Sequence, residues 1–312
     1  MKKTVIAFGE VLWDIMPTAT VLGGAPLNFT YRINSLGNTG LMVSRLGRDE
    51  LGEKAFRQIE ALGMPLNFIQ WDESIPTGTV EVSFDAQRNP DYTIIPEVAY
   101  DHIELTDDLL KQAETADCIC FGTLAQRADK SKKTLRRLLE QSGRAIKFLD
   151  INLRKKCYSP ESIIYSLERS DILKLNSDEV NLLMNLFGYP AITLPDFCEK
   201  MIATWDLKFF IVTMAGEGAF VQSAQGDAVY APGFEIILVD SLGSGDAFSA
   251  GFIHQILQGA PLKEAVVFGN KLGAKVATQK GATVPIEISE LAIFDQGTHN
   301  RIIKQELKEY IL

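Results

Sequence analysis

From about residue 100 onward, the chain alternates short apolar runs with longer segments whose apolar residues recur at helical spacing. The short runs are rich in β-branched and apolar residues and have the length of single strands. This alternation predicts an α/β fold with a mostly parallel central sheet flanked by helices on both faces. The predicted strands are 117–121, 145–151, 171–175 and 208–214, and the predicted helices are 130–141, 160–169, 177–187 and 194–205.

Two stretches depart from this rhythm. Residues 11–21 and 77–95 contain strand-like segments in which polar and apolar residues alternate. Such alternation predicts a sheet with one face in water, unlike the continuously apolar strands elsewhere. We therefore expect a small β lid from about residues 11–22 and 71–98, inserted in a single α/β domain that spans residues 1–312.

The bulk composition limits the partners and the setting. With 31 Lys and Arg against 40 Asp and Glu, the formal net charge is −9, which argues against a general nucleic-acid or anionic-membrane surface. No segment approaches the roughly 18 apolar residues of a membrane-spanning helix. The cysteines fit buried thiols in a reducing, cytoplasmic protein better than a metal site. They are Cys118, Cys120, Cys157 and Cys198.

A glycine-rich turn carries the strongest chemical signal. Gly243, Ser244 and Gly245 follow a strand-like run at 234–239, and a largely apolar predicted helix begins at Asp246. Glycines let the backbone approach a ligand, and the N–H groups of a helix N-terminus form an anion site. Asp246 then either accepts a proton from a hydroxyl that attacks a phosphoryl group, or simply caps the helix. The spacing matches neither of the common phosphate-binding loops, so the residues alone predict an anion site with a carboxylate.

The sequence around this turn resembles a family signature. Residues 240–248, Asp-Ser-Leu-Gly-Ser-Gly-Asp-Ala-Phe, are similar to the Asp-Thr-x-Gly-Ala-Gly-Asp-x-Phe of ribokinase-like (PfkB) carbohydrate kinases. The N-terminal signature of that family has its counterpart in Gly-Gly-Ala-Pro-Leu-Asn at 23–28, with Gly-Arg-Asp-Glu-Leu-Gly at 47–52 behind it. The resemblance covers essentially the whole chain and implies a ribokinase-like fold and an ATP-dependent sugar kinase. It makes Asp246 the catalytic base and places Gly243, Ser244 and Gly245 around the transferring phosphoryl group.

The resemblance also implies a sugar pocket between the α/β body and the lid, lined by Asp14, Gly23, Gly24 and Asn28. Short carboxylate and amide groups suit a polyol because they make paired hydrogen bonds. Without the resemblance, Asp14 reads equally well as a solvated turn residue. Residues 150–154, Asp-Ile-Asn-Leu-Arg, resemble the Asp-x-Asn-x-Arg of fructokinase-like and ketodeoxygluconate-kinase-like members. This match implies that Arg154 holds the γ-phosphate or the sugar, the alternative being a plain surface arginine.

A second motif concerns magnesium. Residues 176–179, Asn-Ser-Asp-Glu, look like the Asn-x-x-Glu of the family. The resemblance implies that Asn176 lies near the nucleotide phosphates and that Glu179 holds Mg²⁺ through water. A hard dication that bridges phosphate oxygens needs few direct protein ligands. The alternative is an ordinary helix start, with Asn176 or Ser177 as its cap and Glu179 favouring the helix dipole.

Further matches imply the rest of the nucleotide site. Residues 213–218 resemble the Thr-x-Gly-x-x-Gly nucleotide loop, although Ala215 stands where a glycine is usual. Asp240, with the carbonyls near Leu242 and Gly281, is a candidate site for K⁺. The nucleotide-binding residues implied in this way are Asn176, Thr213, Gly216, Gly218 and Asn270. Asn270 and a Lys-Gly-Ala turn at 280–282 both match the C-terminal adenine and cation neighbourhood of the family.

These observations predict transfer of the γ-phosphoryl group of Mg·ATP to a primary hydroxyl of a small sugar. Fructose is the leading substrate, because residues 9–14 and 150–154 both look fructokinase-like. A 2-keto-3-deoxygluconate or other sugar-acid kinase is the nearest alternative, and it would need an extra cation in the pocket, for which Arg32 and Arg88 are candidates.

Two remoter alternatives come from other classes. The dinucleotide-binding fingerprint is missing after the first strand, which argues against an oxidoreductase. The intact Asp246 argues against a non-catalytic sugar or nucleotide sensor. The expected partners are therefore ATP and a small sugar, without nucleic acid or membrane. An open lid sheet also favours a homodimer formed through it.

Overall fold

A ten-stranded sheet forms the centre of the molecule, in the computed structural model that describes residues 2–16, 19–84, 90–189, 191–295, 297 and 299–311. Its strands run parallel from β5 to β11 and antiparallel from β11 to β14. In spatial order they are β14 (Arg301–Ile302), β13 (Ala228–Phe234), β12 (Gly218–Ser223), β11 (Phe209–Thr213), β10 (Ile172–Asn176), β9 (Ile146–Asp150), β8 (Cys118–Phe121), β1 (Thr4–Phe8), β4 (Thr39–Gly47) and β5 (Ile69–Asp72).

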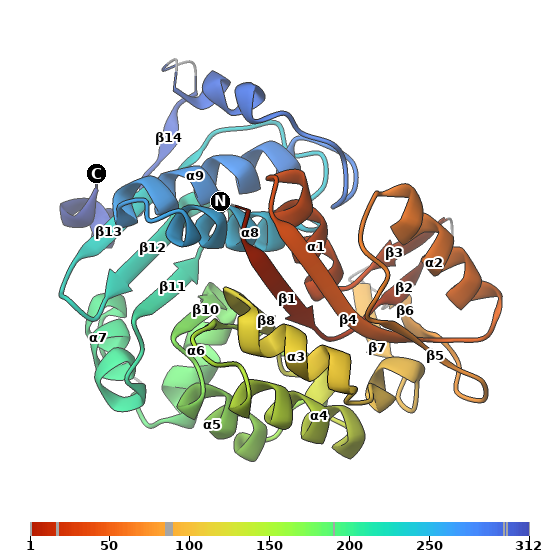
Figure 1. The fold of residues 1–312 in the computed structure, drawn as a ribbon. Coiled ribbons are helices and arrows are strands. Elements are labelled where there is room, and N and C mark those ends of the chain that lie inside the picture. Colours follow the sequence, from red (N-terminus) through yellow and green to blue (C-terminus); the bar gives the residue numbers. More distant parts are fainter. Residues whose placement is uncertain are drawn as a thin grey trace.

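Helices cover both faces of this sheet (Figure 1). One layer contains α1 (Ala25–Ser35), α2 (Glu50–Ala61), α8 (Ser244–Leu257) and α9 (Leu262–Ala277). The other contains α3 (Asp107–Thr115), α4 (Asp129–Glu140), α5 (Pro160–Glu168), α6 (Ser177–Leu186) and α7 (Leu194–Trp205). Short 3₁₀ turns complete the chain: η1 (Ala99–His102), η2 (Leu124–Gln126), η3 (Ala215–Glu217), η4 (Ile288–Phe294) and η5 (Gln305–Tyr310). The predicted α/β fold, with a mostly parallel sheet between two helical layers, is confirmed.

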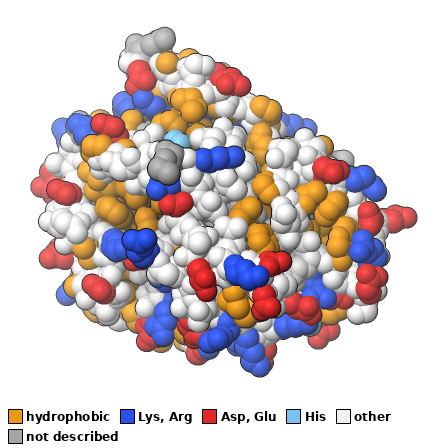
Figure 2. All heavy atoms as spheres, in the orientation of Figure 1, with side chains coloured by type: hydrophobic (Ala, Val, Ile, Leu, Met, Phe, Trp, Pro, Cys, Tyr) orange, Lys and Arg blue, Asp and Glu red, His pale blue; other side chains and the backbone are white. Residues whose placement is uncertain are grey.

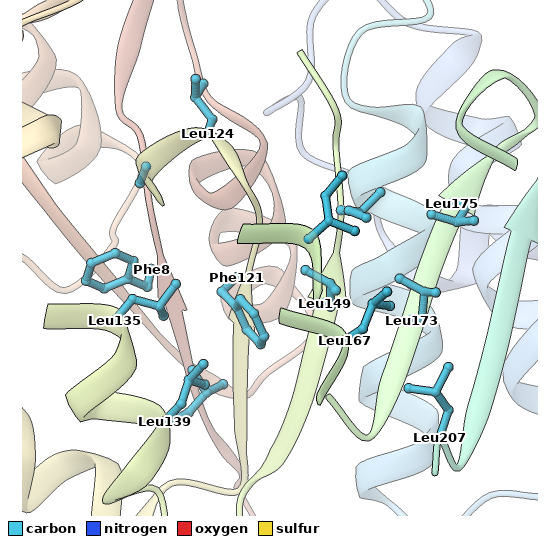
Figure 3. Close-up of a cluster of buried hydrophobic side chains, with 14 of the residues drawn as sticks. Phe8, Phe121, Leu124, Leu135, Leu139, Leu149, Leu167, Leu173, Leu175 and Leu207 are labelled. Carbon is cyan, nitrogen blue, oxygen red and sulfur yellow. The ribbon is translucent and has the colours of Figure 1, made fainter. Parts of the chain in front are cut away.

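The core divides along the two faces of the sheet, because successive strand residues point to opposite sides. In β1, Ile6 and Phe8 join the cluster beneath α3 to α7, whereas Val5 and Ala7 join the cluster beneath α1, α2, α8 and α9. Figure 3 shows the first cluster, to which Phe121 of β8 and Leu139 of α4 both belong. Each large apolar side chain buried in this way contributes about 1.5–3 kcal/mol. The two clusters hold the sheet rigidly between its helices.

A second, four-stranded sheet lies at the carboxyl end of β1. It has the order β3-β2-β6-β7 and comprises β2 (Leu12–Met16), β3 (Ala19–Gly23), β6 (Gly78–Phe84) and β7 (Pro90–Ile94). Its residues fall within the two ranges from which we expect the lid, except Gly23, which lies one residue beyond the first range. Leu12 and Trp13 are buried against the body, while Ile15 and Met16 are exposed. That this sheet moves as a lid stays a prediction, as does the single domain.

The region before α8 differs from expectation. The predicted strand at 234–239 is wrong, because β13 ends at Phe234. The backbone N–H groups of Val239 and Asp240 instead donate to the carbonyl of Ala277 at the end of α9. The chain therefore leaves the sheet here, and Ile237 is 85% exposed. The helix also begins two residues earlier than predicted, at Ser244.

Across the described residues, surface charges of both signs are mixed and the cysteines are buried thiols. Acidic and basic side chains are interspersed over the face shown in Figure 2. Within the described ranges, none of the helices combines the length and the apolar composition that a bilayer crossing requires. The four cysteines are buried and form no disulfide.

Asp49 joins the body to the small sheet. It is the N-cap of α2 and accepts a hydrogen bond from the Gly52 N–H at 2.7 Å. The same carboxylate accepts from the backbone N–H and the hydroxyl of Thr77, both at 2.8 Å. Thr77 directly precedes β6, so one side chain fixes both the start of a helix and the entry to the small sheet.

We predict that Asp49→Ala lowers the free energy of unfolding by about 2 kcal/mol, because it removes a cap and leaves the Thr77 donors unmet. Urea unfolding monitored by circular dichroism measures this change. Glu50→Ala, an exposed residue in the first turn of the same helix, is the matched control and should cost less than about 1 kcal/mol. Equal midpoints for the two variants would contradict the assignment.

Candidate active site

Two helix N-termini open at the carboxyl ends of the parallel strands, where ligands of such sheets bind. Gly24 precedes α1 and Gly243 precedes α8, and neither helix has a side-chain cap. Both glycines have a positive φ, 119° and 75°. A Cβ would lie 2.4 Å from the Glu10 carbonyl oxygen at Gly24, and 2.3 Å from the Ala282 Cβ at Gly243. Only glycine fits, so backbone N–H groups are presented where a side chain would otherwise stand.

Asp246 lies in the first turn of α8, half-buried, as the third helical residue. The alternative that it caps the helix is wrong, because Gly243 holds the cap position. Asn28 of α1 donates from Nδ2 to Asp246 Oδ2 at 2.8 Å. Burial and the nearby Asp150 raise the pKa of Asp246 to about 6, while Asn28, Lys174 and Arg154 act in the opposite direction.

Asn28 has an unmet acceptor. Its side chain is 3% exposed, and Oδ1 has no hydrogen-bond partner in the described part of the chain. A buried amide oxygen of this kind normally receives a donor. Because Nδ2 is committed to Asp246, a ligand hydroxyl that reaches Oδ1 would complete the hydrogen bonding of Asn28.

Asp14 and Gly23 lie together on the hairpin of β2 and β3. A Cβ at Gly23 would come within 2.9 Å of Asp14 Oδ2, so the absence of a side chain there leaves room for the carboxylate. Burial raises the pKa of Asp14, and Arg154 lowers it. Arg154 is exposed, yet its charge also acts on Glu10 and Asp246. The structure therefore brings four of the predicted residues to one place: Asp14, Asn28, Arg154 and Asp246.

Glu10 belongs to the same place, and we assigned it no role from sequence. It is 6% exposed, and burial raises the pKa of its carboxyl to about 7, with Arg154 lowering it and Asp246 raising it. The backbone N–H of Ala25, at the start of α1, also lowers this pKa. The sequence could have pointed to Glu10, because it is an acidic residue between the first strand and the start of the small sheet.

A second unexpected group lies beneath the first turn of α8. Lys174 of β10 is 6% exposed, and its Nζ lies 2.9 Å from each carboxylate oxygen of Asp150 on β9. The Ser249 hydroxyl of α8 is 2.9 Å from Asp150 Oδ2 and 3.0 Å from the Gly245 carbonyl. Burial alone would lower the pKa of Lys174, but Asp150 and Glu179 raise it. The sequence could have pointed to Lys174, because a lysine inside an otherwise apolar strand is unusual.

Asn176 and Glu179 form a capping box at the start of α6. Asn176 Oδ1 accepts from the Glu179 N–H at 3.0 Å, and Glu179 Oε2 accepts from the Asn176 N–H at 2.8 Å. Glu179 Oε1 accepts from the Leu153 N–H at 2.7 Å. The capping alternative is thus present in the structure, and both oxygens of this 6% exposed carboxylate already have backbone donors. Direct coordination of a metal would compete with these bonds.

The loop at 213–218 follows β11, next to β10. Thr213 is the register partner of Asn176. Ala215 has a φ of 47°, so it adopts the left-handed conformation that the usual glycine would take without strain. Gly216 is exposed, whereas Gly218 is buried against β13, where a Cβ would lie 2.1 Å from the Ala231 carbonyl oxygen.

The remaining predicted residues belong to other networks. Asn270 of α9 is buried and donates from Nδ2 to the Pro232 carbonyl at 2.9 Å, which links α9 to β13. Asp240 accepts from the N–H groups of Leu242 and Gly281, each at 3.0 Å. Among the described residues, no three His, Cys, Asp or Glu side chains are grouped so that they could hold a metal ion.

The two arginines considered for a sugar acid are placed differently. Arg32 of α1 is 1% exposed and donates from Nη2 to the Ala282 carbonyl at 2.7 Å. Burial lowers the pKa of Arg32 to about 10. The cation that acts on Asp14, Glu10 and Asp246 is instead Arg154. Arg88 lies outside the described residues.

Comparison with known proteins shows that the chain is similar to sugar kinases over nearly its whole length. Fructokinase-1 of Oryza sativa subsp. japonica is 24% identical over 329 residues, which cover 95% of this chain and 98% of the relative. The Escherichia coli fructokinase is 24% identical over 300 residues, covering 90% and 95%. Fructokinase from Xylella fastidiosa, solved with bound ATP, superposes with a TM-score of 0.81 at 20% identity, covering 95% and 99%. The 2-dehydro-3-deoxygluconokinase of Thermotoga maritima gives 0.83 at 18%, covering 95% and 100%.

The family itself is matched over most of the chain. Residues 6–289 match the family described as pfkB family carbohydrate kinase. This span includes Asp14, the start of α1 and the whole of α8. The chain belongs to the pfkB family of carbohydrate kinases, and the predicted enzyme class, an ATP-dependent sugar kinase, is confirmed with it.

Proposed function

We propose that this protein transfers the γ-phosphoryl group of Mg·ATP to a primary hydroxyl of a small neutral sugar, with fructose as the leading substrate. One observation carries the proposal: Asp246 stands at an uncapped helix N-terminus and is oriented by Asn28 at 2.8 Å. The fructokinases among the relatives of the chain support the choice of fructose.

In the proposed reaction, Asp246 accepts the proton of the sugar hydroxyl as the hydroxyl oxygen attacks the γ-phosphorus. The bond from that phosphorus to the bridging oxygen breaks, and ADP leaves. Because Asn28 occupies Oδ2, Asp246 Oδ1 is the oxygen that would receive the proton. The α8 dipole and the N–H groups of Gly243 and Gly245 would stabilise the developing charge. The Ser244 N–H is a weaker candidate for stabilising this charge, since it already donates to the Ser241 carbonyl at 3.2 Å.

We assign the metals by the chemistry of their donors. When bound, magnesium would neutralise charge on the β- and γ-phosphates. Glu179 suits contact through a water, because both of its oxygens accept backbone N–H groups. Asp240 is our candidate for a monovalent cation such as K⁺; like Glu179, it accepts one backbone N–H at each oxygen.

The charges of the pocket favour a neutral sugar over a sugar acid. Three carboxyl groups, those of Glu10, Asp14 and Asp246, share Arg154 as a neighbouring cation. An additional carboxylate on the substrate would meet like charge at close range. Hydroxyl groups, by contrast, can donate to carboxylates.

Two further features support nucleotide binding and the closing of the small sheet over the site. Ile237, Leu238 and Val239 are exposed consecutively between β13 and α8, an apolar run that a flat base could cover. The sheet that carries Asp14 would, on closing, exclude the water that would otherwise hydrolyse ATP. The homodimer through this sheet stays a prediction.

The first test measures ADP release from Mg·ATP over a panel of fructose, ribose, tagatose, glucose, ketodeoxygluconate and adenosine. We expect the highest kcat/KM for fructose. A preference for ketodeoxygluconate would replace the neutral sugar with a sugar acid. No turnover with any sugar would favour a sensor that binds without catalysis.

We predict that Asp246→Asn lowers kcat by about 10²–10⁴-fold while nucleotide affinity stays within a few-fold, because only proton acceptance is lost. Steady-state kinetics and calorimetric titration with ADP measure the two effects. Asp107→Asn, an exposed carboxylate in the first turn of α3, is the matched control. Turnover near that of the wild type in Asp246→Asn would disprove the proposed base.

We also predict that kcat/KM for the sugar falls as the pH drops through about 6, because Asp246, whose raised pKa is about 6, must be ionised to accept a proton. Asp150→Asn removes a charge that raises this pKa, so the acid limb should move to lower pH. Lys174→Met removes a charge that lowers it, so the limb should move to higher pH. Measuring kcat/KM for the sugar between pH 5 and 8 tests these shifts. An acid limb that does not move in either variant would point to Glu10 as the titrating group.

A further inference from the structure

The last described residues of the chain, 299–311, run along the edge of the large sheet and reach the loop at 213–218. β14 pairs antiparallel with β13, with Ile302 opposite Gly233, and Figure 1 shows it at this edge. Leu307 is fully buried, and the ring of Tyr310 meets that of Phe220 edge-on at 5.3 Å. This C-terminal segment is therefore a packed part of the fold, although it lies beyond the residues that match the family.

Tyr230 of β13 connects the C-terminal segment to the loop. Its ring is fully buried, and its hydroxyl donates to the Glu217 carbonyl at 2.7 Å. The same hydroxyl accepts from the Lys304 N–H at 2.8 Å. One phenol oxygen thus fixes backbone groups of two segments that are far apart in sequence.

Two side-chain contacts reinforce this connection. Lys304 Nζ pairs with Glu217 Oε2 at 3.1 Å. Ile302 Cδ1 lies 3.9 Å from the position of a Cβ on Gly216, so the isoleucine packs on one side of the glycine. Charge, hydrogen bonding and apolar contact all act on residues 216 and 217.

The loop needs such support because its own conformation is strained. Ala215 is exposed and left-handed, with a φ of 47°. A left-handed residue other than glycine costs about 1–2 kcal/mol and persists only when its surroundings hold it. The contacts at Gly216 and Glu217 act on the two residues that directly follow Ala215.

We propose that the C-terminal segment at 302–304 positions the nucleotide loop for Mg·ATP, with Tyr230 and Lys304 as positioning residues. This inference rests on the proposed function, because it takes the loop of Gly216 and Gly218, predicted from the sequence to bind the nucleotide, as part of the ATP site. Four of the five predicted sugar residues, Asp14, Gly23, Gly24 and Asn28, belong to the small sheet or to the start of α1. Loss of the contacts should therefore weaken nucleotide binding and leave sugar binding largely unchanged.

The test compares Tyr230→Phe and Lys304→Ala with the wild type in the full-length chain. Each variant should raise KM for Mg·ATP by about threefold to tenfold, the effect of losing one hydrogen bond or ion pair, with kcat and KM for the sugar within about twofold. Lys308→Ala, exposed on η5, is the matched control and should leave all three constants unchanged. In a double-mutant cycle, Glu217→Ala together with Lys304→Ala should cost no more than the larger single change.

Calorimetric titration with ADP separates the outcomes. A wild type that binds ADP, with both variants binding it equally well, would overturn the inference and leave the proposed kinase intact. Equal rises in KM for ATP and for the sugar would also overturn it, since they would show a general loosening of the fold. A wild type that binds no nucleotide would overturn the proposed function and the inference together.

Discussion

One hydrogen bond, from Asn28 to Asp246, joins residues 218 positions apart, and the candidate active site depends on it. It ties the first turn of α1 to the first turn of α8, so that the carboxylate is oriented by the other half of the chain. α8 in turn is fixed by close contact with α9, where a Cβ on Gly251 would lie 3.1 Å from the Gly269 Cα. Helix packing and one amide therefore both set the position of Asp246.

Buried charge is concentrated around this bond. Lys174 and Asp150 are nearly inaccessible, and a buried ion pair of this kind seldom stabilises a fold more than apolar residues of the same volume would. Its position explains why it is present. Asp150 raises the pKa of Asp246, whereas Lys174 and Arg154 lower it. The site thus combines desolvation with compensating charges, which is how a carboxyl group reaches a pKa near neutrality.

Local chemistry explains which parts of the fold could be predicted from sequence. The helix at 194–205 was predicted with its observed bounds, because Thr193 caps it and Pro195 suits its first turn. The glycine motifs identified the helix N-termini, because only glycine fits at Gly24 and Gly243. The run at 234–239 misled the prediction, since its apolar residues read as a strand although Ile237, Leu238 and Val239 are exposed.

What could not be predicted depends on which strands and segments become neighbours. Lys174 and Asp150 meet because β9 and β10 are adjacent, and periodicity along one strand does not show this. The contact of Lys304 with Glu217 likewise needs the return of the chain to the edge of the sheet. Residues 176–179 fitted a cap and a functional motif equally well, and the observed capping box does not distinguish the two.

The separation of Asn28 from Asp246 also has a consequence for synthesis. Closing so long a loop is entropically costly, and contacts of this kind form late in folding. A ribosome releases the N-terminal strands, the small sheet and most of the proposed sugar-binding residues well before α8 exists. A nascent chain can therefore build much of the parallel sheet while it still lacks the carboxylate and the anion site, so phosphoryl-transfer chemistry would arise only when the C-terminal third of the chain docks.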